Sequence, residues 1–250
     1  MTIDHKNYDA PADLLREKVI LITGASDGIG RALAIETARH GAQVILHGRN
    51  AAKLEKVYDA IEALDGSERP SIAVMDFATA DGTSYSTLAD SLLEEFGRLD
   101  GLVHNAGILG NRQPIEQYDA GEWQKVLHVN LTAAFALTQV LLPLLHQAAN
   151  PSVIFTSSGV GRVGKAFWGA YAVSKFGTEA LSQILAAEQE HTGMRVNCIN
   201  PGAVRTGMRL AAYPAEDRDA LKTPEQILAS YLYLLGPDSK EVTGQSLDAQ

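Results

Sequence analysis

Short apolar segments alternate with longer amphipathic ones along almost all of this 250-residue chain. The short segments have the length of strands, and the segments between them place hydrophobic residues at helical spacing. No internal repeat or low-complexity linker interrupts the alternation. This pattern favours a parallel sheet covered by helices on both faces. The sequence therefore predicts an α/β fold, a single doubly wound domain over residues 1–250 with a seven-stranded parallel sheet and an N-terminal arm at 1–13.

The predicted strands end where the polar motifs of the chain begin. The strands are expected at 18–23, 43–46, 71–75, around 102–103, 152–156, 195–199 and 246–248. The helices are expected at 29–40, 51–64, 83–96, 120–146, from Tyr171 to about 190, and 224–235 with Thr223 as N-cap. Ligands of open α/β sheets bind outside the carboxyl ends of the strands, so this edge is the predicted site.

Composition excludes several classes of partner. The net charge of -9 disfavours nucleic acid and anionic membranes. Cys198 is the only cysteine, so neither a disulfide framework nor a thiolate metal site is available within one chain, and no metal is expected. The start of the chain lacks the apolar core of a secretory signal, and no apolar run approaches the length of a membrane span. A cytoplasmic location is the resulting expectation.

The segment Thr23-Gly24-Ala25-Ser26-Asp27-Gly28-Ile29-Gly30 joins the first strand to the first helix. Glycines allow a sharp turn and close approach of a ligand, and the helix N-terminus presents free N–H groups to a pyrophosphate. A second glycine pattern at 159–164 matches G-x-G-x-x-G literally, but a strand-end residue that reads the ribose would then have to fall inside a helix. We therefore predict the dinucleotide turn at 23–30 and a flexible loop at 159–164.

The second strand ends without an acidic residue, at His47-Gly48-Arg49-Asn50. An acid there would bind the ribose diol of NAD, whereas an arginine accommodates the 2′-phosphate of NADP. Arg49 is also compatible with an ordinary solvated loop arginine. We predict that NADP(H) is preferred over NAD(H).

Tyr171 and Lys175 are spaced i,i+4, so on a helix they lie on the same face. A neighbouring cation favours the phenolate and lowers the pKa of a tyrosine from its ordinary value near 10. This is one way to obtain an acid/base that works at neutral pH. Alone, the pair is also compatible with an unremarkable half-exposed helix.

Together these motifs resemble the short-chain dehydrogenase/reductase family over residues 14–248. The matching elements are TGASDGIG at 23–30, Asp76, Asn105-Ala106-Gly107, Asn130, Ser158, Tyr171 with Lys175, and Pro201-Gly202. Within the family, the phrases HNAGILG, FTSSGVGR, WGAYAVSKF and RVNCINPG most resemble the bacterial YciK group of oxoacyl reductases. The resemblance implies a Rossmann fold and an NADP(H)-dependent oxidoreductase acting on a small-molecule ketone or secondary alcohol.

The resemblance also implies roles for a catalytic set. Tyr171 protonates the carbonyl oxygen as hydride arrives, or removes the proton in the reverse direction. Lys175 lowers the pKa of Tyr171 and binds the nicotinamide ribose. Ser158 holds the substrate oxygen, and its spacing of thirteen residues from Tyr171 favours it over Ser157. Asn130 supports a water that connects Lys175 to solvent.

The implied cofactor contacts lie at five strand ends. Asp76 and Phe77 border the adenine, and Thr206 contacts the carboxamide of the nicotinamide. The full set of expected cofactor residues is Gly24, Ser26, Asp27, Gly28, Ile29, Gly30, Arg49, Asp76, Phe77, Asn105, Ala106, Gly107, Tyr171, Lys175, Pro201, Gly202 and Thr206.

Two departures from the family pattern affect these expectations. Asp27 stands where many NADP-using members have a basic residue, so the phosphate contact falls to Arg49 and Ser26. The chain ends SLDAQ after Gln245, without the usual glycine pair, which weakens the case for a tetramer through the terminal strand. A homodimer through the helices of Asn130 and Tyr171 is expected.

The substrate is expected to contact segments 108–112, 159–168 and about 207–222. The candidate contacts are Ser158, Val160, Phe167, Trp168 and Met208, with Arg112, Arg162, Lys165 and Arg209 available for an anionic group. This mixture fits a hydrophobic ketone and an acyl thioester equally well. The alternative to an enzyme is an NADP(H)-binding regulatory protein with little turnover, which loss of Ser158, Tyr171 or Lys175 would favour. Epimerisation would require a larger C-terminal substrate domain.

Overall fold

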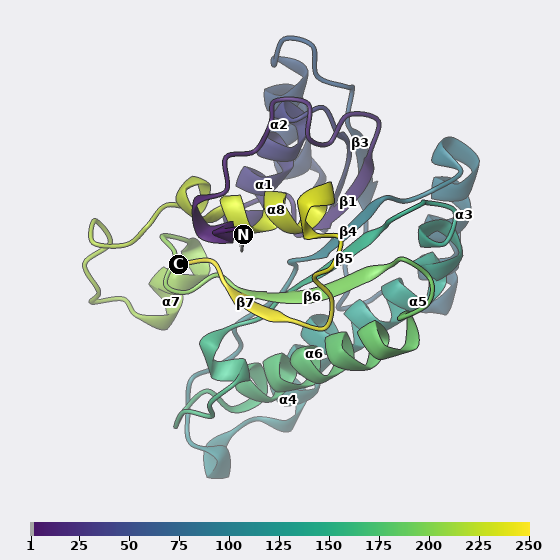
Figure 1. Ribbon diagram of the computed structural model, residues 1–250. Coiled ribbons are helices and arrows are strands. Elements are labelled where there is room, and N and C mark those ends of the chain that lie inside the picture. The colour runs from purple at the N-terminus through teal and green to yellow at the C-terminus, as the bar shows by residue number, and fades with distance from the viewer. Residues whose placement is uncertain (1–2) are drawn as a thin grey trace.

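Seven parallel strands form one sheet in the order β3-β2-β1-β4-β5-β6-β7 (Figure 1). The computed structural model describes residues 3–250. The strands are β1 (Val19–Thr23), β2 (Gln43–Gly48), β3 (Ser71–Val74), β4 (Gly101–His104), β5 (Ser152–Thr156), β6 (Arg195–Asn200) and β7 (Ser246–Asp248). This arrangement confirms the predicted doubly wound α/β fold, and strand order reverses between β1 and β4.

Helices cover both faces of the sheet. The helices are α1 (Gly28–Arg39), α2 (Ala51–Glu62), α3 (Gly82–Phe96), α4 (Ala120–Leu127), α5 (Ala133–Leu145), α6 (Gly169–Glu188), α7 (Gly207–Ala212) and α8 (Ala229–Leu235). Residues of α1, α2 and α8 share one hydrophobic core, and residues of α3, α5 and α6 share the other. Figure 1 shows these two groups of helices on opposite sides of the sheet.

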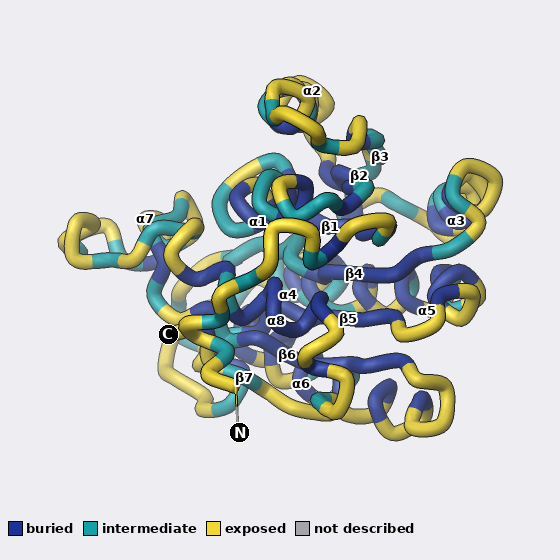
Figure 2. The backbone as a smooth tube through the Cα atoms, turned by 45° about the horizontal axis from the view of Figure 1, so that its top comes forward, coloured by how far each residue is buried: buried dark blue, intermediate teal, exposed yellow. Residues whose placement is uncertain are grey.

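Burial follows from this layering. All five residues of β1, all four of β4 and all five of β5 are buried, as expected for parallel strands covered on both faces. In Figure 2 the central strands are dark blue, while the outward faces of the helices and most loops are yellow. The central strands themselves therefore form the core of the molecule.

The helices begin at the capping residues that the sequence supplies. Asp27, Asn50 and Asp81 each accept a hydrogen bond from a backbone N–H in the first turn of α1, α2 and α3. Because Asp27 and Asn50 directly follow β1 and β2, two helix N-termini open at the same edge of the sheet. That edge carries the predicted site.

Two predicted helices differ from expectation. The helix at 120–146 forms, but it contains a π-helical segment, His128–Thr132, between α4 and α5. The predicted helix at 224–235 is wrong as one element, because a 3₁₀ turn at Pro224–Ile227 is separated from α8 by Leu228. Buried Ile227 and Leu228 both pack in the core of the α1 face, and the break lets both reach it. The sequence did not predict α7.

Within residues 3–250, one helical stretch, Ala120–Leu145, is long and apolar enough by length and composition to cross a membrane. The sequence-based prediction of no membrane span had not singled it out. Its residues Leu137, Leu141 and Leu145 are fully buried against the sheet. The apolar composition of this stretch thus includes the residues with which it covers the sheet.

Candidate active site

A cleft of about 590 Å³ opens at the carboxyl ends of the strands. We call it the strand-end cleft. Of the expected cofactor residues it is lined by Gly24, Ser26, Asp27, Gly28, Ile29, Arg49, Asp76, Phe77, Asn105, Ala106, Gly107, Tyr171, Lys175, Pro201, Gly202 and Thr206. Ser158, Trp168 and Met208 line its substrate side. Residues from seven sequence segments are thus brought to one place.

The glycine turn is packed tightly against the loop after β4. A Cβ atom on Gly30 would lie 2.3 Å from the Gly24 carbonyl oxygen and 2.5 Å from Asn105 Nδ2. Asn105 Nδ2 also donates to the Thr23 carbonyl at 3.1 Å, which fixes the two loops together. Gly30 does not line the strand-end cleft, so its part is to let the turn close on Asn105.

The strand-end residues of β2 and β3 form the far end of the cleft. Arg49 lines the cleft there, and Asp76 Oδ1 accepts from the Ala78 N–H at 3.0 Å, which holds the loop after β3 in shape. Phe77 is only 5% exposed, and its ring stacks on the His47 ring with centroids 4.5 Å apart. Phe77 is therefore mainly a core residue that reaches the cleft wall.

Tyr171 and Lys175 lie on one face of α6, and both are buried at the cleft. Lys175 Nζ donates to the Thr156 carbonyl at 2.7 Å and lies 5.7 Å from the centre of the Tyr171 ring. Burial raises the pKa of Tyr171 to about 12, and a hydrogen bond with Ser158 opposes this rise. Burial also lowers the pKa of Lys175 to about 8.

Burial is the largest cause of the raised pKa of Tyr171, and Lys175 Nζ donates its hydrogen bond to the Thr156 carbonyl. The lowering of this pKa by Lys175, which the resemblance implies, stays a prediction. The phenol of Tyr171 is protonated at neutral pH. Such a group is prepared to donate a proton rather than to accept one.

Ser158 begins a short 3₁₀ turn, Gly159–Gly161, and its Oγ accepts from the Val160 N–H at 3.4 Å. The neighbouring Ser157 Oγ also faces the cleft wall, is buried, and has no hydrogen-bond partner within residues 3–250. The structure thus brings Ser158 to Tyr171, as the spacing predicted, and leaves Ser157 with an unused hydroxyl.

Asn130 lies in the π-helical segment, a type of helix distortion frequent at functional sites. Its Oδ1 accepts from the Ile108 N–H at 2.8 Å, and its Nδ2 donates to the Ile108 carbonyl at 2.9 Å and to Ser174 Oγ at 3.1 Å. Asn130 does not line the cleft, and it joins the loop after β4 to α6. A Cβ on Gly107 would lie 3.3 Å from Asn130 Oδ1 and 3.9 Å from Lys175 Nζ, so Gly107 keeps the space between them open.

The loop after β6 supplies the last wall of the cleft. The Gly202 N–H donates to Asn200 Oδ1 at 3.1 Å, and Thr206 Oγ1 accepts from the Arg209 N–H at 3.2 Å as the N-cap of α7. Thr206 therefore lines the cleft, and its hydroxyl caps the N-terminus of α7.

Two expected substrate contacts do not line the cleft. Val160 is 5% exposed and packs in a small core with Val126 and Trp168. Phe167 is 54% exposed and does not line the cleft, and its backbone adopts a positive φ of 70°. The structure therefore brings neither residue to the cleft, because periodicity does not reveal the direction of a side chain in irregular structure.

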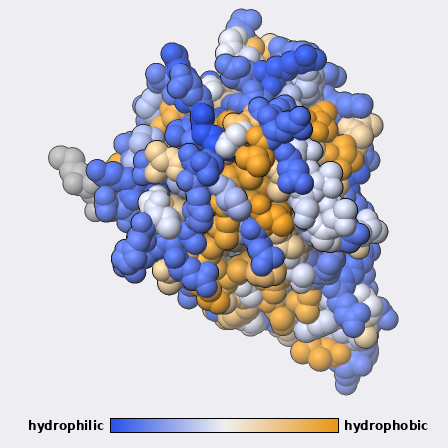
Figure 3. Space-filling view, turned by 90° about the vertical axis from the view of Figure 1, so that its right-hand side faces the viewer, coloured by the Kyte–Doolittle hydropathy of each residue, from blue (hydrophilic) through white to orange (hydrophobic). Residues whose placement is uncertain are grey.

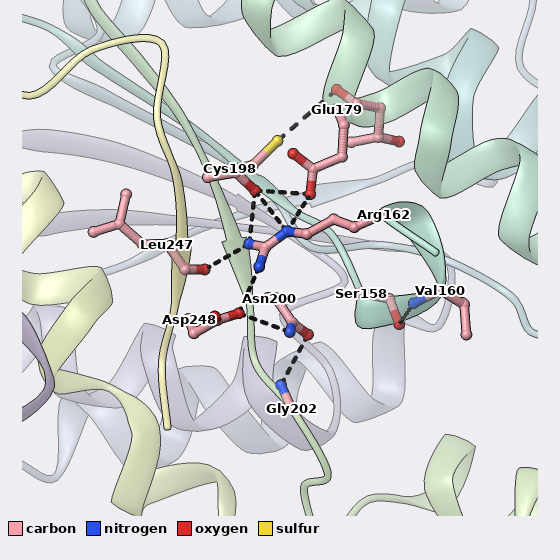
Figure 4. A network of polar contacts seen from close by, with 11 residues as sticks. Ser158, Val160, Arg162, Glu179, Cys198, Asn200, Gly202, Leu247 and Asp248 are labelled. Carbon is pink, nitrogen blue, oxygen red and sulfur yellow. Dashed lines mark hydrogen bonds and ion pairs between the residues drawn. The ribbon is translucent and has the colours of Figure 1, made fainter. Parts of the chain in front are cut away.

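The arginines that were expected to bind an anionic substrate group instead form contacts within the protein. Figure 4 shows Arg162 turned toward the terminal strand, where it binds Asp248 at 2.7 Å, and Arg162 also lies 3.4 Å from Glu179 of α6. Arg209 forms an ion pair with Glu216. The Arg112 guanidinium lies over the rings of Trp168 and Tyr213, 4.7 and 4.8 Å from their centroids.

Sequence reasoning missed several residues that line the cleft. They are His47, Asn50, Lys53, Met75, Lys125, Val129 and Thr156, among others. Of these, Lys53 carried a detectable signal, since it lies one turn into the helix that follows Arg49. His47 is 1% exposed and neither ring nitrogen has a partner within residues 3–250.

The donor set fits a phosphorylated dinucleotide. The N-terminus of α1 faces the cleft behind a glycine turn, and Arg49 lies at the end of β2. Ser157 and His47 also line the cleft, and their buried polar side-chain atoms have no hydrogen-bond partner within residues 3–250. Lys175 and Tyr171 lie beside the loop where the nicotinamide end would be held.

The fold and this site define a class of enzyme, and comparison with known proteins agrees. Residues 18–217 match the family of short chain dehydrogenases. The chain belongs to this family and is an oxidoreductase.

Several members of the family are similar to this chain over nearly its full length. Oxidoreductase YciK of Escherichia coli (strain K12) is 48% identical over 244 residues, which cover 98% of this chain and 96% of that protein. A short chain dehydrogenase of Shigella flexneri 2a complexed with NADP has a TM-score of 0.94 and 48% identity, covering 96% of this chain and 100% of that one. One from Escherichia coli CFT073 complexed with NADPH has a TM-score of 0.94 and 49% identity, covering 96% and 99%. These findings confirm the resemblance, and they show that relatives of this similarity bind NADP and NADPH.

Proposed function

We propose that this oxidoreductase reduces a ketone, or oxidises the corresponding secondary alcohol, with Tyr171 as the acid/base. The observation that carries the proposal is the meeting of Tyr171, Lys175 and Ser158 in one cleft, with the phenol buried and protonated at neutral pH. A protonated phenol within reach of a serine hydroxyl is suited to neutralise an alkoxide as it forms.

NADPH, when bound, supplies the hydride that reduces the carbonyl carbon. The Tyr171 Oη–H donates its proton to the carbonyl oxygen, and the Ser158 hydroxyl donates a hydrogen bond to that oxygen while its negative charge develops. Lys175, held beside the ring by Thr156, stabilises the phenolate that remains. In the reverse direction the same phenolate removes the proton of the alcohol.

Asn130 serves this chemistry as a positioning residue. Its amide donates to Ser174 Oγ, which in turn donates to the Tyr171 carbonyl at 2.7 Å. The same amide exchanges two hydrogen bonds with Ile108. Asn130 therefore fixes the helix of Tyr171 relative to the loop that borders the substrate.

The substrate end of the cleft favours an apolar ligand. Its lining includes Ile108, Leu109, Val129, Trp168, Met208 and Ala212. This wall suits the carbon chain of a 3-oxoacyl compound or the ring of another hydrophobic ketone, because burial of apolar surface provides the binding energy.

We further propose that the protein is a homodimer. Phe135 of α5 and Val173, Phe176 and Ile184 of α6 are 44–55% exposed although all are apolar. Figure 3 looks at the side where α3 and α5 lie and shows hydrophobic side chains gathered in a broad band. A second copy would cover the α5–α6 face, since exposed apolar patches of this kind mark interaction surfaces.

Replacement of Tyr171 by phenylalanine tests the enzymatic proposal. NADPH oxidation is measured with a panel of ketones, diketones and 3-oxoacyl thioesters, and Tyr171→Phe should abolish it while NADPH still binds. Tyr85→Phe is the matched control, because Tyr85 is equally buried but lies outside the cleft. Full activity in Tyr171→Phe would refute the mechanism. Tight NADPH binding without oxidation of any panel member would favour the regulatory alternative.

A further inference from the structure

Lys53 reaches the strand-end cleft from α2 and forms an ion pair with Asp27 of the glycine turn. The distance from Lys53 Nζ to Asp27 Oδ2 is 2.9 Å, and both residues line the cleft together with Arg49. Asn50 holds the first turn of α2 in place, because its Oδ1 accepts from the Lys53 N–H at 3.0 Å. Three charged side chains therefore line the same cleft, and two of them, Lys53 and Asp27, are in contact.

The charge of Asp27 is a difficulty for a phosphorylated cofactor. The hydrogen bond from Lys53 lowers the pKa of Asp27, so the carboxylate is ionised at neutral pH. Its Oδ1 accepts from the Gly28 N–H at 2.8 Å, which fixes the carboxylate at the N-terminus of α1. A carboxylate at this position repels a phosphate unless a cation neutralises it.

The Lys53–Asp27 ion pair contributes little to the stability of the fold. The Lys53 and Asp27 side chains are 54% and 72% exposed, and exposed pairs of this kind contribute little to stability. Its location in the cleft wall, next to Arg49, gives it an effect on the ligand instead.

We propose that Lys53 is a second determinant of NADP(H) specificity, which neutralises Asp27 and adds a cation beside Arg49 for the 2′-phosphate. With Lys53 present the three side chains carry a net positive charge, and without it Arg49 and Asp27 cancel. This inference rests on the proposed placement of the 2′-phosphate at Arg49. It explains how the chain binds NADP(H) with an acid in the glycine turn.

The test is a set of binding titrations that need no substrate. The dissociation constants of NADPH and NADH are measured by cofactor fluorescence for the unmodified protein, Lys53→Gln, Asp27→Asn, the double variant and Arg49→Ala. Lys56→Gln is the matched control, because Lys56 is an exposed lysine of the same helix that does not line the cleft. It changes the net charge of the protein equally.

Lys53→Gln should weaken NADPH binding about tenfold and leave NADH binding within about twofold. The loss should be smaller when Asp27 is already Asn, since no carboxylate is then exposed to the phosphate. A loss in Arg49→Ala but none in Lys53→Gln beyond that of Lys56→Gln would overturn the inference and leave the cofactor site intact. An equal loss for NADPH and NADH would overturn it as well. Neither result depends on turnover, so the Tyr171→Phe experiment fails or succeeds separately.

Discussion

Tyr171 and Lys175 show how burial controls the chemistry of single residues. The phenol is protonated because its phenolate would be desolvated, and the lysine loses its proton more readily for the same reason. Each group thus has a pKa displaced toward its neutral form. At neutral pH Tyr171 therefore carries the proton that carbonyl reduction requires.

The titration of Lys175 has a measurable consequence for stability. Its pKa of about 8 in the folded protein lies below the ordinary 10.5, so the unfolded chain binds more protons between these values. The folded state therefore gains stability as pH rises from about 8 toward about 10.5. Urea unfolding of the unmodified protein and of Lys175→Met should show the variant favoured at about pH 7 and this advantage shrinking toward about pH 10. A constant difference would contradict the lowered pKa.

Two buried histidines carry a related cost at acid pH. Burial lowers the pKa of His47 to about 4 and of His104 to about 3. The unfolded chain binds their protons first, so the stability that neutral imidazoles permit is lost as pH falls below about 6.5.

His47→Leu should reduce this loss, because it removes a buried group that titrates and whose nitrogens have no partner within residues 3–250. The free energy of unfolding, measured at about pH 7.5 and about pH 5, should fall less for His47→Leu than for the unmodified protein. His191→Leu, at an exposed position, is the control. An equal fall in both variants would exclude His47 as a source of acid sensitivity.

At the scale of elements, Arg112 fastens the loop after β4 to α7. Its guanidinium lies over the rings of Trp168 and Tyr213, and its Nη1 donates to the Ala212 carbonyl. The Trp168 ring lies 5.6 Å from the Tyr171 ring, so the contact reaches the residue that transfers the proton. Cation–π contacts of this kind are worth about 0.5–2 kcal/mol each.

Arg112→Ala should therefore loosen segment 207–222 over the substrate. The chain has two tryptophans, and Trp123→Phe leaves only Trp168. In that background, Arg112→Ala should shift the fluorescence emission of Trp168 to the red. Trypsin should also cleave the segment faster at Arg218. Arg39→Ala is the control, since Arg39 is exposed at the end of α1. An unchanged spectrum and cleavage rate would show that Arg112 does not hold α7.

How far the elements could be predicted depended on periodicity. β2 and β4, the two strands that pair with β1, contain continuous apolar runs, and α1 to α3 begin at capping residues. The positions of these strands and helices were therefore predictable to within a few residues. The break at Leu228 was not, because it arises from packing of buried Ile227 and Leu228 against other elements. The π-helical segment likewise results from the hydrogen bonds of Asn130 across the fold.

Some residues of the candidate site were likewise predictable from the sequence, and others were not. Residues at strand ends were predictable as cleft residues, because the topology of a parallel sheet places all carboxyl ends at one edge. Val160, Phe167 and Arg162 were not, because the direction of a side chain in a loop depends on what the loop packs against. The pKa of Tyr171 was not predictable either, since it depends on the depth of burial and not on spacing along a helix.

At the scale of the whole molecule, the α5–α6 face should set the oligomeric state. Phe176→Glu places a charge in the centre of this apolar surface and should convert a dimer into a monomer at micromolar concentration. Light scattering after size-exclusion chromatography measures the mass. Ile115→Glu, at another exposed apolar position, is the control. A monomeric unmodified protein would refute the proposed homodimer.

The strand order has a consequence for how the chain assembles as it is synthesised. After β3, every new strand pairs with the strand that precedes it or with β1: β4 joins β1, and β5, β6 and β7 add one after another at the same edge. Each new strand therefore pairs with a strand that has already been synthesised, and the sheet forms from its N-terminal strands toward β7. The cofactor cleft is finished much later than its glycine turn, because Pro201, Gly202 and Thr206 follow β6. We expect the nascent chain to acquire its sheet progressively and its capacity to bind NADPH only near the end of synthesis.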